Sequence, residues 1–508
     1  MIGKTNTICT YGYQTLAVQV EVDIIPGTVG MQIVGLGDNA IKESRERIRS
    51  AITHSGFEFP VKYIVVNLAP NEKPKEGSIS EFAICVAILI ASGQLPQDFF
   101  TDKILMGSLS LDGRLQNPVG LMGAALHASQ LKMIQSVVIP EKSLGDVGCI
   151  PELNIYPIDC LSDIRRLMAG EITQYFNTAL KAPESKIEVN MSQISGLLYA
   201  KKALAYAAIG KHHTMMMGSP GTGKTMLARA YKFILSEMSR EEILSTTYIY
   251  SLAKLVQGKL IFTRPFRSPH HTTSGIALVG GGTRPMPGEV SLAHNGVLFL
   301  DELMEFPAST LQALREPMED HVITISRATG TFTFPANFQL LAATNPCRCG
   351  YLFTPGRACS CTPLLVKNLY RKIIGPFLDR ISIEVEVRET QDLQCLKLGE
   401  EKDTSFWSSK VMEARKRMFH RNGGVLNSDL PLEKVRQIYQ NLNGCDPLIR
   451  SFSASRMLSN RGILNTLRTS ISIMDFNESS IMRTEFLEEA FTYRVICHLK
   501  DTYFDKVA

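Results

Sequence analysis

Residues 218–225 fill every fixed position of the phosphate-binding pattern GxxxxGK[ST], which constrains the fold more than any other feature of this chain. The pattern requires a buried strand before it and a helix after it. Both are predicted here, because residues 213–217 are a short apolar run and residues 226–230 suit a helix. The sequence therefore predicts a nucleoside triphosphate site made of Gly218, Ser219, Pro220, Gly221, Thr222, Gly223, Lys224 and Thr225.

Each residue type in this loop has a chemical reason. Glycines let successive backbone N–H groups point at phosphate oxygens, and the amino terminus of the helix adds its positive dipole end. Lys224 is expected to reach the β- and γ-phosphates, and the hydroxyl of Thr225 to bind Mg²⁺, which prefers oxygen ligands. A glycine turn with a chance lysine is the alternative, and the flanking strand and helix disfavour it.

A second element lies downstream, where the apolar residues 296–300 lead into Asp301 and Glu302. A strand that ends in two acids is typical of a Walker B element. Asp301 is expected to hold the water shell of Mg²⁺ and Glu302 to orient the attacking water, because phosphoryl transfer depends on positioning and charge neutralisation. Acids that only end a buried strand are the alternative, which the phosphate loop weakens.

Two further segments resemble those of AAA+ ATPases. The apolar residues 338–344 end at Asn345, where an AAA+ ATPase has its sensor 1 amide, which holds the γ-phosphate and the lytic water. Residues 375–380 resemble the segment that carries the arginine finger, which implies that Arg380 reaches the γ-phosphate of a neighbouring subunit. Hydrolysis would then depend on a ring. A surface arginine with a local carboxylate partner is the alternative for Arg380.

Other segments are similar to the magnesium-chelatase-like branch of the AAA+ proteins, and two of them narrow the resemblance to its ComM type, the YifB family. The first group comprises residues 264–272, 280–282 and 287–296, and the second residues 313–320 and 345–350. The resemblance covers essentially the whole chain. It implies a ring, expected to be a hexamer, that uses ATP and Mg²⁺.

The chain has 508 residues, too many for one core, which predicts about three domains. The resemblance implies an α/β protein in which an S5-type, Lon-protease-like α+β domain precedes a P-loop AAA+ domain with a parallel sheet and a helical lid. The expected bounds are 1–170 for the first domain, 171–192 for a linker, 193–390 for the AAA+ core and 391–508 for the lid. Within the first domain, residue patterns predict a strand over 15–23, a helix over 38–55 and a strand over 63–68.

Residues 74–78 and 107–115 resemble the S5-type fold shared with the Lon protease domain, which raises the alternative of a peptidase. Such a peptidase needs a serine nucleophile and a lysine base within hydrogen-bond reach. At the position where Lon proteins carry the serine, this chain has Ile79, and residues 118–126, which match the lysine region, contain no lysine. Ser78 and Ser80 lie nearby, but without a base they are ordinary hydroxyls. Proteolysis is therefore disfavoured, and the domain is interpreted as an interaction or DNA-guiding module.

The chain has eleven cysteines, and seven of them are scattered singly, as expected for reduced thiols. The other four form two CxC pairs separated by nine residues, Cys347 with Cys349 and Cys359 with Cys361. Four thiolates brought together in this way suit tetrahedral Zn²⁺. The CxC spacing is tighter than that of most zinc sites, so free or redox-active thiols remain the alternative.

The region after about residue 390 has a helical pattern and is expected to carry the sensor 2 arginine. Residues 459–462 resemble the family's entry to the sensor 2 helix, which favours Arg461, with Arg456 and Arg468 as alternatives. One predicted helix also carries a basic cluster that either contacts DNA phosphate or, in the favoured interpretation, forms a solvated face. Its members are Lys410, Arg415, Lys416, Arg417, His420 and Arg421.

The family resemblance implies a DNA motor that migrates branched junctions in recombination, particularly during natural transformation, with single-stranded or branched DNA as its partner. The net charge of +5 is compatible with nucleic acid but does not decide the matter. A chelatase-like or chaperone-like ATPase that remodels a protein is the second hypothesis. A nucleotide-controlled binding module without motor action is the third, and Glu302, Asn345 and Arg380 disfavour it.

Membrane insertion is not expected, because the longest apolar run, residues 82–92, is too short to span a bilayer and the amino terminus begins polar. Together with the resemblance, this predicts a soluble protein of the bacterial cytoplasm.

Overall fold

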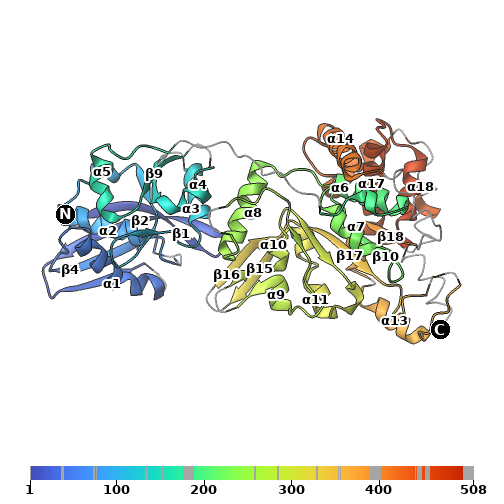
Figure 1. Ribbon diagram of the computed structural model, residues 1–508, viewed down its shortest axis with the longest axis horizontal. Coiled ribbons are helices and arrows are strands. Elements are labelled where there is room, and N and C mark those ends of the chain that lie inside the picture. Colours follow the sequence, from blue (N-terminus) through green and yellow to red (C-terminus); the bar gives the residue numbers. More distant parts are fainter. Residues whose placement is uncertain are drawn as a thin grey trace.

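Figure 1 shows an elongated molecule, with the amino-terminal part at one end, a central α/β part, and carboxy-terminal helices packed on the far side of the central part. The computed structural model describes residues 2–35, 39–71, 75, 77–131, 136–150, 153–175, 188–256, 259–282, 285–327, 330–352, 354, 356–373, 375–388, 402–440, 442, 449–451 and 458–495. The predicted domain boundaries stay predictions. Residues 176–187, in the predicted linker, and residues 389–401, where the lid is predicted to begin, lie outside the described residues.

The amino-terminal part is built on a mixed sheet with the strand order β3-β4-β2-β1-β5-β8-β9. Its strands are β1 (Gly3–Tyr11), β2 (Gln14–Ile25), β3 (Gly30–Val34), β4 (Tyr63–Ala69), β5 (Lys103–Leu105), β8 (Ser136–Pro140) and β9 (Asn154–Ile158), and a separate two-stranded sheet pairs β6 (Ser108–Leu109) with β7 (Leu115–Gln116). The helices are α1 (Asn39–His54), α2 (Glu81–Ala91), α3 (Leu121–Gln130), α4 (Leu144–Val147) and α5 (Ile164–Met168).

Residue patterning explains these elements. Val18, Val20 and Val22 alternate with more exposed neighbours in β2, so one face of the strand is buried. By contrast α2 is apolar on all sides, and its residues 81–90 are all buried. The predicted strand over 15–23, helix over 38–55 and strand over 63–68 are confirmed as β2, α1 and β4.

The central part contains a five-stranded sheet in which every strand pair is parallel, in the order β11-β14-β17-β10-β18. Its strands are β10 (Thr214–Met217), β11 (Phe266–Arg267), β14 (Val297–Leu300), β17 (Gln339–Thr344) and β18 (Ile383–Glu386), with β12 (Gly280–Gly281) paired to β13 (Met286–Pro287) and β15 (Val322–Arg327) to β16 (Gly330–Pro335). The helices are α6 (Leu198–Gly210), α7 (Lys224–Tyr231), α8 (Arg240–Leu252), α9 (Gly275–Val279), α10 (Glu289–Leu292), α11 (Ala308–Ala313), α12 (Pro317–Asp320) and α13 (Pro363–Arg371).

This topology positions the candidate site. β10 lies inside the sheet, and both of its neighbours, β17 and β18, come much later in the chain. The strand order therefore changes direction at β10. A change of this kind opens a crevice at the carboxyl ends of the strands, where parallel sheets bind ligands. The sequence-predicted strands that lead into Asp301 and Asn345 are confirmed as β14 and β17, and both end at this same edge.

The amino-terminal and central parts meet beside the β15–β16 hairpin and α8 (Figure 1), and aromatic side chains are in contact there. Tyr11 stacks on Phe332 with ring centroids 4.4 Å apart, and Tyr13 lies against Tyr248 at 4.8 Å. Arg240 of α8 adds a hydrogen bond of 2.7 Å to the carbonyl oxygen of Cys149. Buried aromatic pairs contribute both area and a preferred geometry, so this contact defines how the two parts meet.

The carboxy-terminal helices share a core with the central part. They are α14 (Thr404–Asn422), α15 (Leu432–Tyr439), α17 (Asn460–Phe476) and α18 (Thr484–Thr492). Leu204 of α6, Val411 of α14 and Ile471 of α17 belong to one buried hydrophobic cluster. His212 Nε2, just before β10, also lies 2.8 Å from the hydroxyl of Ser472. The helices therefore pack on α6 and contact the residue just before β10, the strand that leads into the phosphate loop.

The helix α14 carries the basic cluster, and the prediction of a solvated face is wrong for its three arginines. Arg415 donates to the carbonyl oxygen of Ala208, Arg417 donates to the carbonyl oxygen of Asp475, and Arg421 forms an ion pair with the Asp475 carboxylate. These acceptors lie on α6 and α17, far away in the sequence, so no local pattern could reveal them. These three arginines hold α14 against α6 and α17, so they are not free to bind DNA phosphates.

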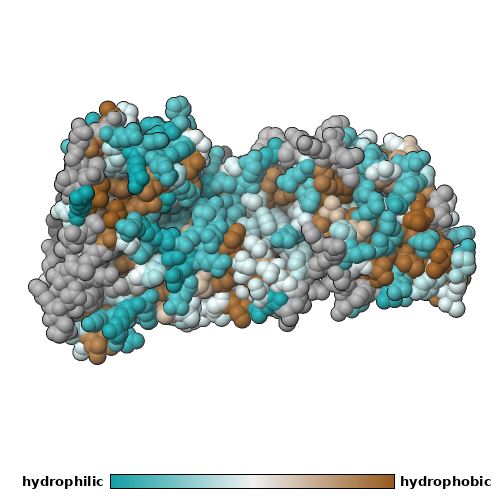
Figure 2. Space-filling view, turned by 180° about the vertical axis from the view of Figure 1, so that it is seen from behind, coloured by the Kyte–Doolittle hydropathy of each residue, from teal (hydrophilic) through white to brown (hydrophobic). Residues whose placement is uncertain are grey.

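The opposite face of the molecule shows hydrophobic residues in separate groups, with hydrophilic residues between them (Figure 2). Scattered apolar surface of this kind is ordinary for a folded protein. Within the described ranges, no helix combines the length and the apolar character needed to cross a bilayer.

The glycine that precedes β14 supports a stability prediction. A Cβ atom on Gly296 would lie 2.1 Å from the carbonyl oxygen of Pro265, and that backbone is tied to β14. We expect Gly296→Ala to destabilise the fold by about 1–3 kcal/mol, as overpacking in a closely packed interior does. The measurement is the midpoint of thermal unfolding. Gly275→Ala is the matched control, because nothing lies within 4 Å of its added Cβ; equal midpoints for the two variants would contradict the prediction.

Candidate active site

The phosphate loop runs from the end of β10 to the start of α7. Gly221 and Gly223 have φ angles of +82° and +88°, in the left-handed region that side chains rarely adopt. These glycines therefore permit the turn that brings the backbone into the first turn of α7. The amino terminus of that helix faces the crevice at the carboxyl edge of the sheet, an arrangement suited to binding anions.

Lys224 is held inside the loop. Its Nζ atom donates to the carbonyl oxygens of Gly218 and Ser219, both at 2.8 Å, and to Oδ1 of Asn345 at 3.2 Å. Burial lowers the pKa of Lys224, and the nearby Asp301 carboxylate opposes this shift. The structure thus brings together the predicted lysine, the first residue of α7, and the predicted sensor 1 amide, which follows β17.

Thr225 and Asp301 form the oxygen-rich side of the site. The Thr225 hydroxyl donates to Oδ2 of Asp301 at 2.9 Å, and Oδ1 of the same carboxylate accepts the backbone N–H of Glu302 at 3.0 Å. A hydroxyl and a carboxylate oxygen at this separation suit Mg²⁺, which takes hard oxygen ligands and keeps several waters. The donor set therefore fits the predicted ion.

Glu302 follows directly, in a left-handed conformation with φ of +52°. Its side chain is 57% exposed, and its Oε2 atom lies 3.3 Å from Nδ1 of His271. Sequence reasoning could not assign a role to His271, because only the pairing of β11 with β14 brings it beside Glu302. A non-glycine residue in this backbone region is uncommon and often marks a functional position.

Arg380 lies at the opposite edge of the sheet. Arg380 is three residues before β18, and the first residue of β18, Ile383, pairs with Thr214 at the start of β10. The phosphate loop, by contrast, follows the end of β10. Its guanidinium pairs with Glu319 at 2.8 Å and donates to the carbonyl oxygen of Arg315. Within its own chain, Arg380 therefore has the local carboxylate partner and lies at the end of the sheet away from the phosphate loop.

Arg461 lies beside Arg380 and also forms an ion pair with Glu319. A cavity of about 490 Å³ at this edge is lined by both arginines, by Lys211 and by Arg468. Arg468 is already engaged, because it donates to the carbonyl oxygen of Leu430. Arg456, the third sensor 2 candidate, lies outside the described residues. Glu319 and Asp429 also line the cavity, so its four Lys and Arg side chains exceed its two carboxylates, a net positive charge that suits an anionic partner.

The four clustered cysteines come together directly after the sensor segment. All four Sγ atoms lie within 4.8 Å of one another, and those of Cys347 and Cys349 are 3.2 Å apart. The four are free thiols, with Cys347 buried and the others partly exposed. Hydrogen bonding from the backbone of Tyr351 lowers the pKa of Cys349, which favours the thiolate, the form that binds metals.

Comparison with known proteins places these features in a family. The family description "Magnesium chelatase, subunit ChlI" matches residues 190–395, "Subunit ChlI of Mg-chelatase" matches 20–143, and "Magnesium chelatase, subunit ChlI C-terminal" matches 401–494. The protein YifB of Escherichia coli (strain K12) is 37% identical over 499 residues, which is 97% of each chain. The chain belongs to the ComM/YifB-type magnesium-chelatase-like family. Competence protein ComM of Haemophilus influenzae is 35% identical over 500 residues, 96% of each chain.

Membership of the ComM/YifB family supports an AAA+ ATPase, in agreement with the parallel sheet and the loop after β10. A short match also exists to an archaeal Lon protease of Archaeoglobus fulgidus, 44% identical over 54 residues, which is 11% of this chain and 9% of the protease. A match of that length carries no information about the protease's activity in this ComM/YifB-type protein.

Proposed function

We propose that this protein hydrolyses ATP at the carboxyl edge of its parallel sheet, and that it does so in a ring whose subunits complete one another's sites. The proposal of ATP hydrolysis rests on two hydrogen bonds in one crevice, from Thr225 to Asp301 and from Lys224 to Asn345. A structural glycine turn would not need these four side chains at the ends of three different strands.

Each residue of the proposed site has a separate role in binding or hydrolysis. The backbone N–H groups of the loop bind phosphate oxygens, and Lys224 exchanges its contacts with the loop carbonyls for the β- and γ-phosphates. Thr225 and Asp301 would hold Mg²⁺, which supplies neutralisation of the phosphate charge when bound. Glu302 orients and polarises the attacking water, and Asn345 holds the γ-phosphate.

The ring follows from the position of Arg380 and Arg461. Arg380 and Arg461 line one cavity near the start of β10, whereas the phosphate loop follows the end of β10, so we place them at a neighbour's nucleotide and not at their own. A head-to-tail neighbour would present its nucleotide edge to them, and repeated head-to-tail contacts close into rings. In this arrangement, Arg380 acts as the arginine finger and Arg461 as the sensor 2 arginine, with Glu319 holding both until the nucleotide arrives. A hexamer is the expected ring.

The amino-terminal part is proposed to be Lon-like in fold but without the peptidase dyad. Ile79 is buried at the position of the Lon serine. Lys75, the lysine nearest to Ser78 and Ser80 in the sequence, donates its Nζ hydrogen bonds to the backbone oxygens of Gly35 and Pro70. A lysine bound in this way stabilises a turn and does not act as a base for a serine. The carboxy-terminal helices are the proposed lid.

We further propose that ATP hydrolysis drives the migration of branched DNA in recombination during natural transformation, as the similarity to competence protein ComM suggests. Remodelling of a protein partner is the second candidate, favoured by the match to magnesium chelatase subunits. The two differ in which polymer stimulates the ATPase. A binding module without hydrolysis is disfavoured by the exposed Glu302 beside the site.

The first test is the ATPase rate with single-stranded, duplex and four-way-junction DNA. We expect branched or single-stranded DNA to stimulate the ATPase, because a DNA motor couples hydrolysis to movement along DNA. Lys224→Ala should abolish this stimulation. A rate that is the same with every DNA would contradict the DNA motor and favour a protein substrate. Repeating the assay at several salt concentrations provides the control, since binding to DNA phosphates weakens steeply as salt rises.

A further inference from the structure

The four-cysteine cluster has the dimensions of a metal site. The Sγ atoms of Cys347, Cys349 and Cys359 are 3.2, 3.5 and 3.6 Å apart, and that of Cys361 completes a group within 4.8 Å. Four sulfur ligands at about 2.3 Å from a tetrahedral Zn²⁺ would stand about 3.8 Å apart. The observed separations are close to this value and far from the bond length of a disulfide, which is about 2.05 Å.

The segment that carries the cysteines has no regular secondary structure in its described residues. Residues 345–362 contain no helix or strand among those described, although they connect β17 to α13. Loops of this length without secondary structure are uncommon inside a domain. A structural Zn²⁺ contributes free energy of folding directly, so it would add to the packing of Cys347 and Leu352 and fix the shape of a segment without secondary structure.

This segment is also part of the nucleotide site. Asn345, which contacts Lys224, is two residues before Cys347. The hydroxyl of Thr354 lies 2.5 Å from that of Ser219 in the phosphate loop. Gly350 packs on Pro220 so closely that a Cβ atom would lie 2.4 Å from its Cδ.

Tyr370 of α13 adds a further link, because its hydroxyl donates to the carbonyl oxygen of Pro346 at 3.1 Å and lies 3.3 Å from the sulfur of Met217, the last residue of β10. The cysteine segment therefore forms one wall of the phosphate loop. A change in its shape would move the loop's backbone.

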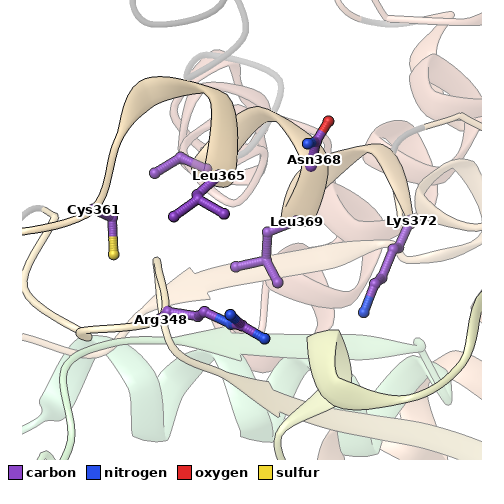
Figure 3. A pocket seen from close by; sticks show the side chains of 7 residues that line it. Arg348, Cys361, Leu365, Asn368, Leu369 and Lys372 are labelled. Atoms are coloured by element: carbon purple, nitrogen blue, oxygen red, sulfur yellow. The ribbon is translucent and has the colours of Figure 1, made fainter.

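The cluster is open to solvent on one side. Figure 3 shows Cys361, just before α13, facing the segment of Arg348 across a pocket of about 190 Å³, with Leu365 and Leu369 of α13 along its other wall. A metal ion or a chelator can therefore reach the cluster from the side of Cys361 without unfolding the sheet.

We propose that Cys347, Cys349, Cys359 and Cys361 bind one Zn²⁺, and that this ion sets the affinity for nucleotide by holding the wall of the phosphate loop in place. The effect on nucleotide affinity rests on the proposed ATP site, whereas the binding of zinc does not. Zinc binding releases the thiol protons and involves no change of oxidation state.

The metal is tested on the purified full-length protein by elemental analysis and by Co²⁺ substitution. We expect about one zinc per chain and, after exchange, the absorption of a tetrahedral cobalt–thiolate site. Cys349→Ser should lower the zinc content, while Cys160→Ser, a partly exposed free cysteine outside the cluster, should leave it unchanged. Zinc well below one per chain without a cobalt spectrum, or a disulfide among these cysteines by mass spectrometry, would overturn the proposal.

The coupling is tested with a variant that keeps all four ligands. Gly350→Ala should retain zinc but bind a fluorescent ATP analogue about tenfold more weakly, as expected for the loss of one or two hydrogen bonds from a displaced loop. Gly356→Ala is the matched control, because Gly356 lies in the same segment with a similar φ, +77° against +84°, and has nothing within 4 Å of its added Cβ.

Equal affinity in the two glycine variants would overturn the coupling. Failure of the ATP site itself would be recognised separately, since Lys224→Ala would then bind the analogue as tightly as the unaltered protein, while the zinc content would be unaffected.

Discussion

Replacing Glu302 with glutamine is expected to slow ATP hydrolysis by about 100- to 10,000-fold while ATP remains bound, the range found when a general base is removed. Glutamine has the same shape but cannot polarise the attacking water. Binding should persist because, in the proposed site, Lys224 and the loop backbone bind the phosphates and Glu302 does not. Single-turnover hydrolysis and equilibrium binding of a fluorescent ATP analogue measure the two quantities separately.

Glu305→Gln is the matched control for this experiment, because Glu305 is an exposed glutamate three residues further along the same turn. It should hydrolyse ATP at the rate of the unaltered protein. Lys224→Ala gives the opposite pattern from Glu302→Gln, since it should lose binding as well as hydrolysis. If Glu302→Gln kept its full rate of hydrolysis, the assignment of Glu302 would be wrong.

Replacing Arg380 with alanine is expected to reduce hydrolysis by about 1,000-fold or more, the size of effect known for arginine fingers. The reason is its place near the start of β10, at the end of the sheet away from the phosphate loop, where a neighbour's nucleotide would meet it in the proposed ring. ATP binding by the single chain should be unchanged. Arg371→Ala, an exposed arginine on α13, is the control and should keep its activity.

A mixing experiment separates a role across the subunit interface from a role in folding. Arg380→Ala and Lys224→Ala are each inactive, but a head-to-tail interface in a mixed ring can combine the intact Lys224 of one with the intact Arg380 of the other. For random mixing in equal amounts, about a quarter of the interfaces should be complete. Recovery of activity on mixing is the expected result. A mixture as inactive as its components would contradict the proposed interface.

The sequence alone was sufficient for the elements around the candidate site. The strand before the phosphate loop, the helix after it and the strands that lead into Asp301 and Asn345 all form as predicted. These predictions depend on short runs of residues, because a buried parallel strand is apolar throughout and a glycine-rich turn follows from local backbone geometry. The close grouping of the four cysteines was also predictable from their spacing.

The tertiary structure alone decided which partners the charged side chains have. The arginines of α14 looked like a solvated face, yet they bond to α6 and α17. Likewise, only the folded structure shows that His271 lies beside Glu302 and that Gly350 packs against Pro220. The physical reason is that periodicity and propensity act over a few residues, whereas ion pairs and close packing depend on segments that meet only when the sheet order is established.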